Sequence, residues 1–229
     1  MLYSLELVTA LSVMVASAAE WPQFRGPQGD GHADAAQLPT SWSETENIAW
    51  KAAIPGRGWS SPAIGDGLLW VTTAVEHPAT PDQADAVKKG ALAGNPLANQ
   101  MTIVGSITLR AVALDIDTGK IRHDIKLFDV KDPEPVHSLN SYASPSPVLV
   151  DNRLICHFGT FGTACVDTGT GKILWKADLP NHHSVGPGSS PAVFEDRVII
   201  PCDGTEHQYV AALDLFTGDL VWKTQRPPM

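Results

Sequence analysis

The sequence lacks most of the short patterns that mark common catalytic sites. Its 229 residues include only three cysteines, with no adjacent pair and no C-x-x-C spacing, so a metal site built on paired cysteines is excluded. No G-x-S-x-G nucleophile elbow is present. The glycines of Gly56-Arg57-Gly58 and Gly186-Pro187-Gly188 are not followed by a helical pattern, which a phosphate-binding loop requires. Serine hydrolases of the elbow type and phosphate-loop enzymes are therefore not indicated.

The chain also lacks any block of like charges. The formal net charge is −9, and the acidic residues are spread along the sequence. A dispersed acidic balance favours solubility and argues against nucleic acid or anionic lipid as a partner. We therefore expect no nucleic-acid partner.

Long apolar runs are scarce, and the main candidate lies at the N-terminus. Leu5–Ala16 is largely apolar but too short for a membrane span. Ala16-Ser17-Ala18 and Ser17-Ala18-Ala19 both fit a signal cleavage site, although the region before them has Glu6 and no Lys or Arg. Residues 1–19 are predicted to be a signal peptide, with a buried helix as the alternative. No lipid-anchor cysteine follows, so we expect a periplasmic or secreted protein with no membrane span after cleavage.

What the sequence does contain is a repeat of the form A-x-D-x-x-T-G-x-x-x-W. The repeated positions are Asp115, Thr118 and Gly119; Asp167, Thr170, Gly171 and Trp175; and Asp214, Thr217, Gly218 and Trp222. His123 stands at the tryptophan position of the first copy. Asp and Thr side chains bond backbone groups in turns and Gly supplies positive φ, so each copy is predicted to be two β-strands joined by a tight turn. A large aromatic at a fixed place suits packing between adjacent sheets, so all these residues are interpreted as structural.

A serine-proline segment precedes each copy and opens another hairpin. These segments begin at Ser60, Ser144 and Ser189, and strands follow at 68–73, 153–158 and 197–202. Proline is tolerated at the first residue of a strand. The unit is therefore four antiparallel strands that recur about every 40 to 50 residues, which describes one blade of a propeller. Because the serines recur with the blade, they are interpreted as structural and not as nucleophiles.

The repeats divide the chain into a lead-in and about three blades. Residues 20–47 are predicted to be an ordered lead-in loop pinned by Trp21 and Phe24, and the propeller repeats fill residues 48–229. The predicted blades are 59–127, with an insertion at 75–101 that is functional or mobile and can hold a short helix over 82–93; 140–179; and 188–224.

An isolated tryptophan strand precedes the first blade. Trp50–Pro55 aligns with Trp175–Pro180, so Ile48–Ala52 is predicted to be an orphan outer strand. Such a strand completes the last blade of a ring and limits exposed edges. Closed propellers typically have four to eight blades. The expected fold is therefore all-β, a partial β-propeller of about three four-stranded antiparallel blades, and the chain is expected to be a truncated part of a longer protein.

With these residues in hand, the chain resembles the pyrroloquinoline-quinone-like (PQQ-like) β-propeller repeat proteins over about residues 20–225. The blade motif carries the resemblance, and the lead-in W-P-Q-F-R-G-P and the run G-R-G-W-S-S-P-A are similar to an exported bacterial subgroup. The wider family includes quinoprotein alcohol dehydrogenases and the propeller lipoprotein of the outer-membrane β-barrel assembly machinery. The resemblance implies the propeller fold, whereas fold alone does not define function.

Two function classes follow from the resemblance. The first is a non-catalytic exported scaffold, similar to an outer-membrane assembly factor, that binds a protein or another ligand on a propeller rim and needs no cofactor. The alternative is part of a quinone-dependent alcohol or sugar dehydrogenase, which would imply PQQ over a calcium ion, a catalytic aspartate and often adjacent cysteines. This chain has no adjacent cysteines, and its repeated aspartates are explained as turn residues. We therefore expect no catalytic residue, no resident metal, and a partner that is a protein or the missing blades.

The ligand-binding candidates are polar residues in the links between blades. They are His137, Asn140 and Tyr142 before the second blade, His182 and His183 before the third, and His157 on a neighbouring strand. These links are expected on one rim of the propeller. One interpretation is a ligand or metal site, because imidazoles are common transition-metal ligands. The other is solvated loop histidines plus one strand histidine that bonds the backbone, because no spacing fixes a coordination geometry.

Two of the cysteines are expected to face each other. If Phe158 pairs with Thr163, then Cys156 falls opposite Cys165. An exported protein can form a disulfide there, and the other interpretation is two buried thiols on facing strands. Cys202 has no evident partner.

Overall fold

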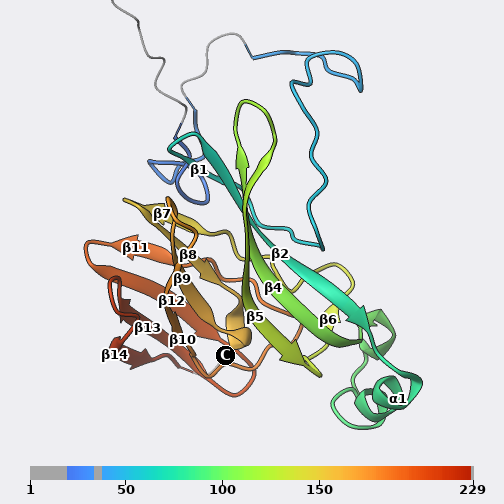
Figure 1. The fold of residues 1–229 in the computed structure, drawn as a ribbon. Coiled ribbons are helices and arrows are strands. Elements are labelled where there is room, and N and C mark those ends of the chain that lie inside the picture. Colours follow the sequence, from blue (N-terminus) through green and yellow to red (C-terminus); the bar gives the residue numbers. More distant parts are fainter. Residues whose placement is uncertain (1–19, 34–37, 228–229) are drawn as a thin grey trace, which may run out of the picture.

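The computed structural model describes residues 20–33 and 38–227, and these form three four-stranded antiparallel sheets (Figure 1). The expected signal peptide at 1–19 lies outside the described residues. The first sheet is β1 (Ala63–Gly65), β2 (Leu68–Pro78), β4 (Val104–Asp115) and β5 (Ile121–Lys131). The second is β7 (Val148–Val150), β8 (Arg153–His157), β9 (Thr163–Asp167) and β10 (Ile173–Ala177). The third is β11 (Ala192–Phe194), β12 (Arg197–Asp203), β13 (Gln208–Asp214) and β14 (Leu220–Gln225).

The Thr-Gly turns join the last two strands of each sheet, as the repeat predicts. In the second sheet, Asp167 Oδ1 accepts hydrogen bonds from the Thr170 N–H at 2.7 Å and the Thr170 hydroxyl at 2.6 Å. The Gly171 N–H donates to the Asp167 carbonyl at 2.8 Å, and Gly171 has φ of 72°. Bonding from Thr170 holds the pKa of Asp167 below its usual value, and the same holds for Asp115 with Thr118. The aspartate and threonine side chains and the glycine backbone therefore close the turn together.

A β-bulge precedes the aromatic position in every sheet. The register shifts between Ile121 and His123, between Ile173 and Trp175, and between Leu220 and Trp222 in the respective outer strands. Because a bulge places one extra residue on one strand, it re-aims the side chain that follows. The bulge therefore directs His123 and Trp175 toward the next sheet, where they lie against Gly171 and Gly218. The repeat motif did not predict the bulge.

The core lies between the sheets. One cluster of buried residues joins the first and second sheets and includes Trp70 and Leu154. A second joins the second and third sheets and includes Trp175, Ile200 and Tyr209. Each sheet thus buries its faces mainly against its neighbours, which is the nearest-neighbour packing of a repeat protein.

The serines before each first strand connect neighbouring sheets, which confirms their structural interpretation. The Ser61 N–H donates to Ser146 Oγ at 2.9 Å, and the Ser146 N–H donates to Ser190 Oγ at 2.9 Å. One serine per sheet therefore links the edges formed by β1, β7 and β11.

The insertion in the first sheet is ordered, and its helix is shorter than expected. The strand β2 continues to Pro78, and α1 spans Pro81–Lys89, not 82–93. Thr80 caps it, since its hydroxyl accepts from the Gln83 N–H while the Gln83 side chain accepts from the Thr80 N–H. A short 3₁₀ turn η1 (Ala98–Gln100) leads to β3 (Met101–Thr102), which pairs with β6 (Val136–His137) in the link before the second sheet.

The lead-in segment is pinned by Trp21 but not by Phe24. Trp21 pairs with Ile64 through backbone hydrogen bonds of 2.8 and 2.9 Å, and its ring lies against Gly26. Phe24 is 56% exposed, so the expectation that it anchors the segment is wrong.

Residues Ile48–Ala52 lie where the orphan strand was expected, but they form no strand hydrogen bonds. No residue of it pairs with a strand among the described residues. Yet the Trp50 indole N–H donates to the Ile116 carbonyl at 2.8 Å, just as the Trp175 indole N–H donates to the Leu215 carbonyl at 2.9 Å. Trp50 therefore lies where the outer-strand tryptophan of a preceding sheet would lie. The strand itself is missing because its pairing partner would belong to that sheet.

The two cysteines do not face each other, which corrects the expected register. Cys156 pairs with Ala164, and Cys165 pairs with Ile155. The cause is the 3₁₀ turn η2 (Gly159–Phe161), which lets Phe158 bond Gly162 and moves the pairing by one residue. All three thiols are free and buried, as the alternative interpretation held.

Candidate functional site

The site is built from the two links that connect successive sheets, together with the insertion. The insertion and α1 lie at the opposite end of the first sheet from the turn between β4 and β5 (Figure 1). The His137 N–H donates to the Val185 carbonyl at 3.1 Å, and the Asn140 side-chain amide donates to the same carbonyl at 3.0 Å. His137 also bonds Gln100 of η1 at 3.0 Å. The structure therefore brings both links to one rim, and it adds the insertion, which the sequence did not place there.

His157 and His183 are neutral residues of the rim interior. His157 is 2% exposed, and its Nδ1 bonds the Thr163 hydroxyl at 2.8 Å. His183 Nε2 accepts a hydrogen bond from the Thr160 N–H at 3.2 Å. Burial lowers the pKa of His157 to about 3 and that of His183 to about 4. Both imidazoles therefore carry no charge near neutral pH, and His157 bonds a side chain and not the backbone.

His182 contacts Glu134 and closes the second link. Its Nδ1 lies 2.7 Å from Glu134 Oε1, and the other Glu134 oxygen accepts from the His183 N–H at 3.2 Å. Burial raises the pKa of Glu134, and the charge of His182 opposes that rise. The pair fixes the link at 180–189 against the link at 132–147, so Glu134 belongs to the site although no sequence spacing pointed to it.

Tyr142 is buried next to an incompletely bonded charge pair. Its side chain is 0% exposed and packs edge-on against Phe161, with ring centroids 5.6 Å apart. Among the described residues, its hydroxyl has no hydrogen-bond partner, nor have Arg57 Nε and Glu76 Oε1. Burial raises the pKa of Tyr142, to which the charge of Glu76 adds. Arg57 Nη2 lies 3.3 Å from Glu76 Oε1. Tyr142, Arg57 and Glu76 therefore form one cluster of polar groups beneath the rim.

Exposed apolar side chains lie on the same joined segments. They are Leu139 at 75% exposed, Val185 at 38% and Leu97 at 37%. The Leu139 N–H donates to His137 Nδ1. The Ser138 N–H donates to the Gln100 carbonyl, and the Gln100 N–H donates to the Leu97 carbonyl. We call Leu97, Leu139 and Val185 the rim patch. An apolar centre with polar neighbours is the usual composition of a protein-binding surface.

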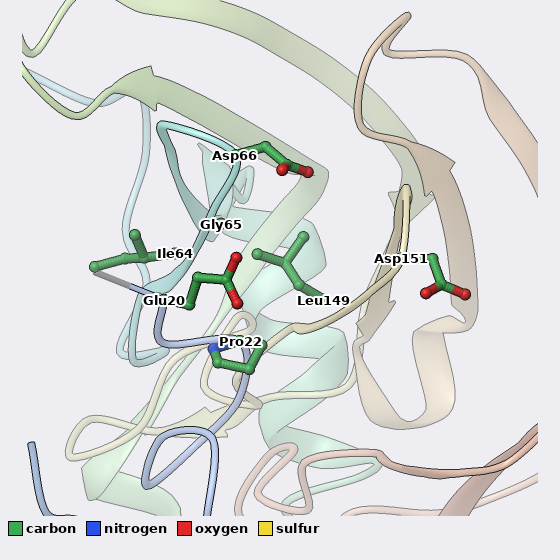
Figure 2. A pocket seen from close by; sticks show the side chains of 7 residues that line it. All are labelled: Glu20, Pro22, Ile64, Gly65, Asp66, Leu149 and Asp151. Atoms are coloured by element: carbon green, nitrogen blue, oxygen red, sulfur yellow. The ribbon is translucent and has the colours of Figure 1, made fainter. Parts of the chain in front are cut away.

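Two separate hollows, of about 310 and 180 Å³, lie outside the two links. The larger hollow, about 310 Å³, lies between the lead-in and the turns of the first two sheets. Figure 2 shows Glu20 beside Pro22, Asp66 on the turn after β1, and Asp151 on the turn after β7. All three carboxylates are exposed. Within residues 20–33 and 38–227, no three His, Cys, Asp or Glu side chains come together as a metal site.

The arrangement of the repeat aspartates is also not that of a catalytic centre. Asp115, Asp167 and Asp214 lie in turns that their own threonines and backbone groups complete. Across the part of the chain that the structure covers, no helix has the length and apolar character that a bilayer crossing needs. The three repeat aspartates therefore act as turn residues.

Three stacked four-stranded antiparallel sheets with one Thr-Gly turn each define a β-propeller repeat protein, of which these sheets are the blades. The model of the family described as "Outer membrane protein assembly factor BamB" matches residues 83–228, which is more than half of the chain. The chain belongs to this family, as the PQQ-like blade motif had indicated.

One curated relative is the outer membrane protein assembly factor BamB of Burkholderia pseudomallei (strain K96243). It is 25% identical over 191 residues, which cover 77% of this chain and 47% of that protein. The chain thus spans about half the length of this relative.

Several solved structures are similar. A europium-containing methanol dehydrogenase has a TM-score of 0.48 and 15% identity over 78% of this chain and 26% of its own. BamB from Moraxella catarrhalis has a TM-score of 0.37 and 20% identity over 56% of this chain and 35% of its own.

Proposed function

We propose that this chain is a non-catalytic propeller scaffold that binds a protein partner through the rim patch. The observation that carries the proposal is the rim itself, where two links and an insertion are locked together to display Leu139, Val185 and Leu97. Holding loops in one geometry lowers the entropy lost on binding. Scaffolding requires a stable surface and no reactive group, which fits a rim whose histidines are engaged in hydrogen bonds.

The family and the named relative support the class of partner. The relative from Burkholderia pseudomallei is named as an assembly factor for outer membrane proteins. We propose the same class of process for this chain, with a partner that is a protein of outer-membrane assembly and a location in the periplasm or outside the cell. No cofactor is part of the proposal.

A quinone-dependent reaction finds no support in the residues that could serve it. Calcium would need free carboxylates, yet Asp167 Oδ1 already accepts from two groups of Thr170. These turns also lie at the end of the sheets opposite the rim. We therefore derive no oxidoreductase step for this chain.

The test places a photoreactive amino acid at position 139 in cells, with position 121 as the matched control. Ile121 is also an exposed apolar residue, at 43%, but lies beside a Thr-Gly turn at the other end of its blade. We expect cross-links from position 139 to a protein of outer-membrane assembly, identified by mass spectrometry, and few from position 121. Equal labelling at both positions would contradict a rim site. Reduction of a dye by an alcohol, dependent on added PQQ and calcium, would contradict a non-catalytic scaffold.

A further inference from the structure

A small cavity lies between the second and third blades, beside the link that joins them. It measures about 140 Å³. His157 at the end of β8 lines it from the second blade, and Pro201 and Asp203 of β12 line it from the third. The link at 180–189 forms the rest of the lining. The cavity is therefore separate from the two hollows near the first blade.

The glycine at position 188 keeps this cavity open. A Cβ built on Gly188 would meet no atom within 4 Å, and its φ is not positive. Two residues before the serine that precedes each first-strand proline, the same place holds Trp59 in the first copy and Ser144 in the second. The backbone at this place thus accepts a side chain, whereas in the third copy the space is left free.

The imidazole of His157 gives the cavity a nitrogen without a partner. The residue is buried, and its Nδ1 is held by the Thr163 hydroxyl at 2.8 Å. Of the residues that the structure describes, none bonds the Nε2 of His157. Buried polar groups in proteins nearly always have a hydrogen-bond partner. The Nε2 is therefore the ring nitrogen that an occupant of the cavity can bond.

His183 adds a hydrogen-bond donor to the same lining. Its Nε2 accepts from the Thr160 N–H at 3.2 Å, so the neutral ring carries its proton on Nδ1. In the part of the chain that the structure covers, this Nδ1–H donates to no group. Ser184 and Ser189 also line the cavity and bring hydroxyl groups. The lining thus offers several neutral donors and acceptors.

The charges of the lining favour an uncharged occupant. Burial lowers the pKa of His157 to about 3 and that of His183 to about 4, so both rings are neutral near pH 7. Asp203 is the one charged group among the lining residues, and its carboxylate is paired with Arg226. Neither an anion nor a cation finds an unpaired opposite charge here. An ion would therefore lose its hydration without compensation.

From this geometry we infer that the cavity binds a small uncharged polyol, whose hydroxyls bond His157 Nε2 and His183 Nδ1. A hydroxyl both donates and accepts, so it can bond His157 in either tautomer. The volume of about 140 Å³ is below the roughly 300 Å³ at which sites for drug-sized ligands begin, so the occupant is of the size of glycerol. This inference does not rest on the proposed function, because the cavity shares only Val185 with the rim patch.

The test follows the histidine ring nitrogens of the full chain by nuclear magnetic resonance while glycerol is added. His157→Gln and His183→Gln assign the two signals. We expect both signals to shift saturably, with a dissociation constant of about 1 mM for so small a ligand. The signal of His77, which is exposed on β2, should not move. A titration without saturable shifts at His157 and His183 overturns the inference.

Three matched ligands test the chemistry of the cavity. n-Propanol keeps the carbon chain of glycerol but lacks two hydroxyls, so it should bind at least about tenfold more weakly. Glycerate and serinol are similar in size but carry a negative and a positive charge, and both should also bind more weakly than glycerol. Equal or tighter binding of any of the three would contradict a site for an uncharged polyol.

A pair of glycine variants tests the location. Gly188→Leu fills the cavity and should abolish the saturable shifts. The control is Gly169→Leu, an exposed turn glycine without positive φ, whose place in the third blade is held by Phe216. Both variants should melt like the unmodified chain, which separates loss of the site from loss of the fold. Unchanged glycerol binding by a folded Gly188→Leu chain, or its loss in Gly169→Leu, would overturn the inference.

Discussion

Replacing Trp175 or Trp222 by alanine isolates the contribution of one contact between blades. The two residues hold the same place in the repeat, follow the same bulge, and differ mainly in what covers them. Trp175 packs against the third blade and donates to the Leu215 carbonyl, whereas Trp222 is 40% exposed on the outer strand of the third blade. The same substitution at both positions therefore removes the same atoms from two environments.

The structure gives the size of the expected difference. Trp175 is 7% exposed and Trp222 is 40% exposed, so about a third more of the residue surface is buried at Trp175. With about 250 Å² for a tryptophan side chain, this is about 80 Å², or about 2 kcal/mol at about 25 cal/mol/Å². The indole hydrogen bond adds about 1 kcal/mol. Trp175→Ala should therefore lower the free energy of unfolding by about 3 kcal/mol more than Trp222→Ala.

Urea unfolding followed by far-ultraviolet circular dichroism measures this difference, since it does not rely on the fluorescence of the residues removed. The two midpoints should separate clearly, with Trp175→Ala unfolding at the lower urea concentration. Equal losses of stability would show that Trp222 is covered in solution or that the Trp175 indole contact contributes little. A larger loss at Trp222 would refute the assignment of the two environments.

Three further outcomes are expected. Tyr142→Phe should be neutral or raise the free energy of unfolding by up to about 1 kcal/mol, because the buried hydroxyl has no partner among the described residues; a loss in thermal melting would show that the hydroxyl is bonded. Between pH 6.5 and about 4, His157 and His183 take up protons in the unfolded chain but stay neutral in the folded chain. The free energy of unfolding therefore has its full value above pH 6.5 and falls below it by about 1.4 kcal/mol per pH unit for each histidine. His157→Gln should halve that slope in urea titrations. The thiols should resist a disulfide reagent until the chain unfolds, because burial raises the pKa of Cys165 to about 12 and shields the thiols; rapid reaction of the folded chain would refute this.

The turns and the sheets could be predicted because only a few residue types can form these turns. An aspartate three residues before Thr-Gly closes a turn by itself, as Asp167 and Thr170 do. The recurrence of that turn set the number of sheets and the order of strands. The common position of the links also followed, since every connection between blades of this topology emerges at one end.

The details of the site depended on contacts that no local pattern contains. The pairing of β3 with β6 joins segments more than thirty residues apart and positions His137. Glu134 joins His182 only through the fold. The one-residue shift at Cys156 arose from the length of η2, which the alternation of side chains did not reveal.

The exposed outer strand of the third blade has a consequence for how this chain opens. All six residues of β14 are exposed, whereas β9 is flanked by strands on both sides and by clusters on both faces. Local opening follows the number of packed neighbours. The amide hydrogens that bond β13 to β14 should thus exchange with solvent first, and those of β9 last. Unfolding is therefore expected to proceed inward from the C-terminal blade.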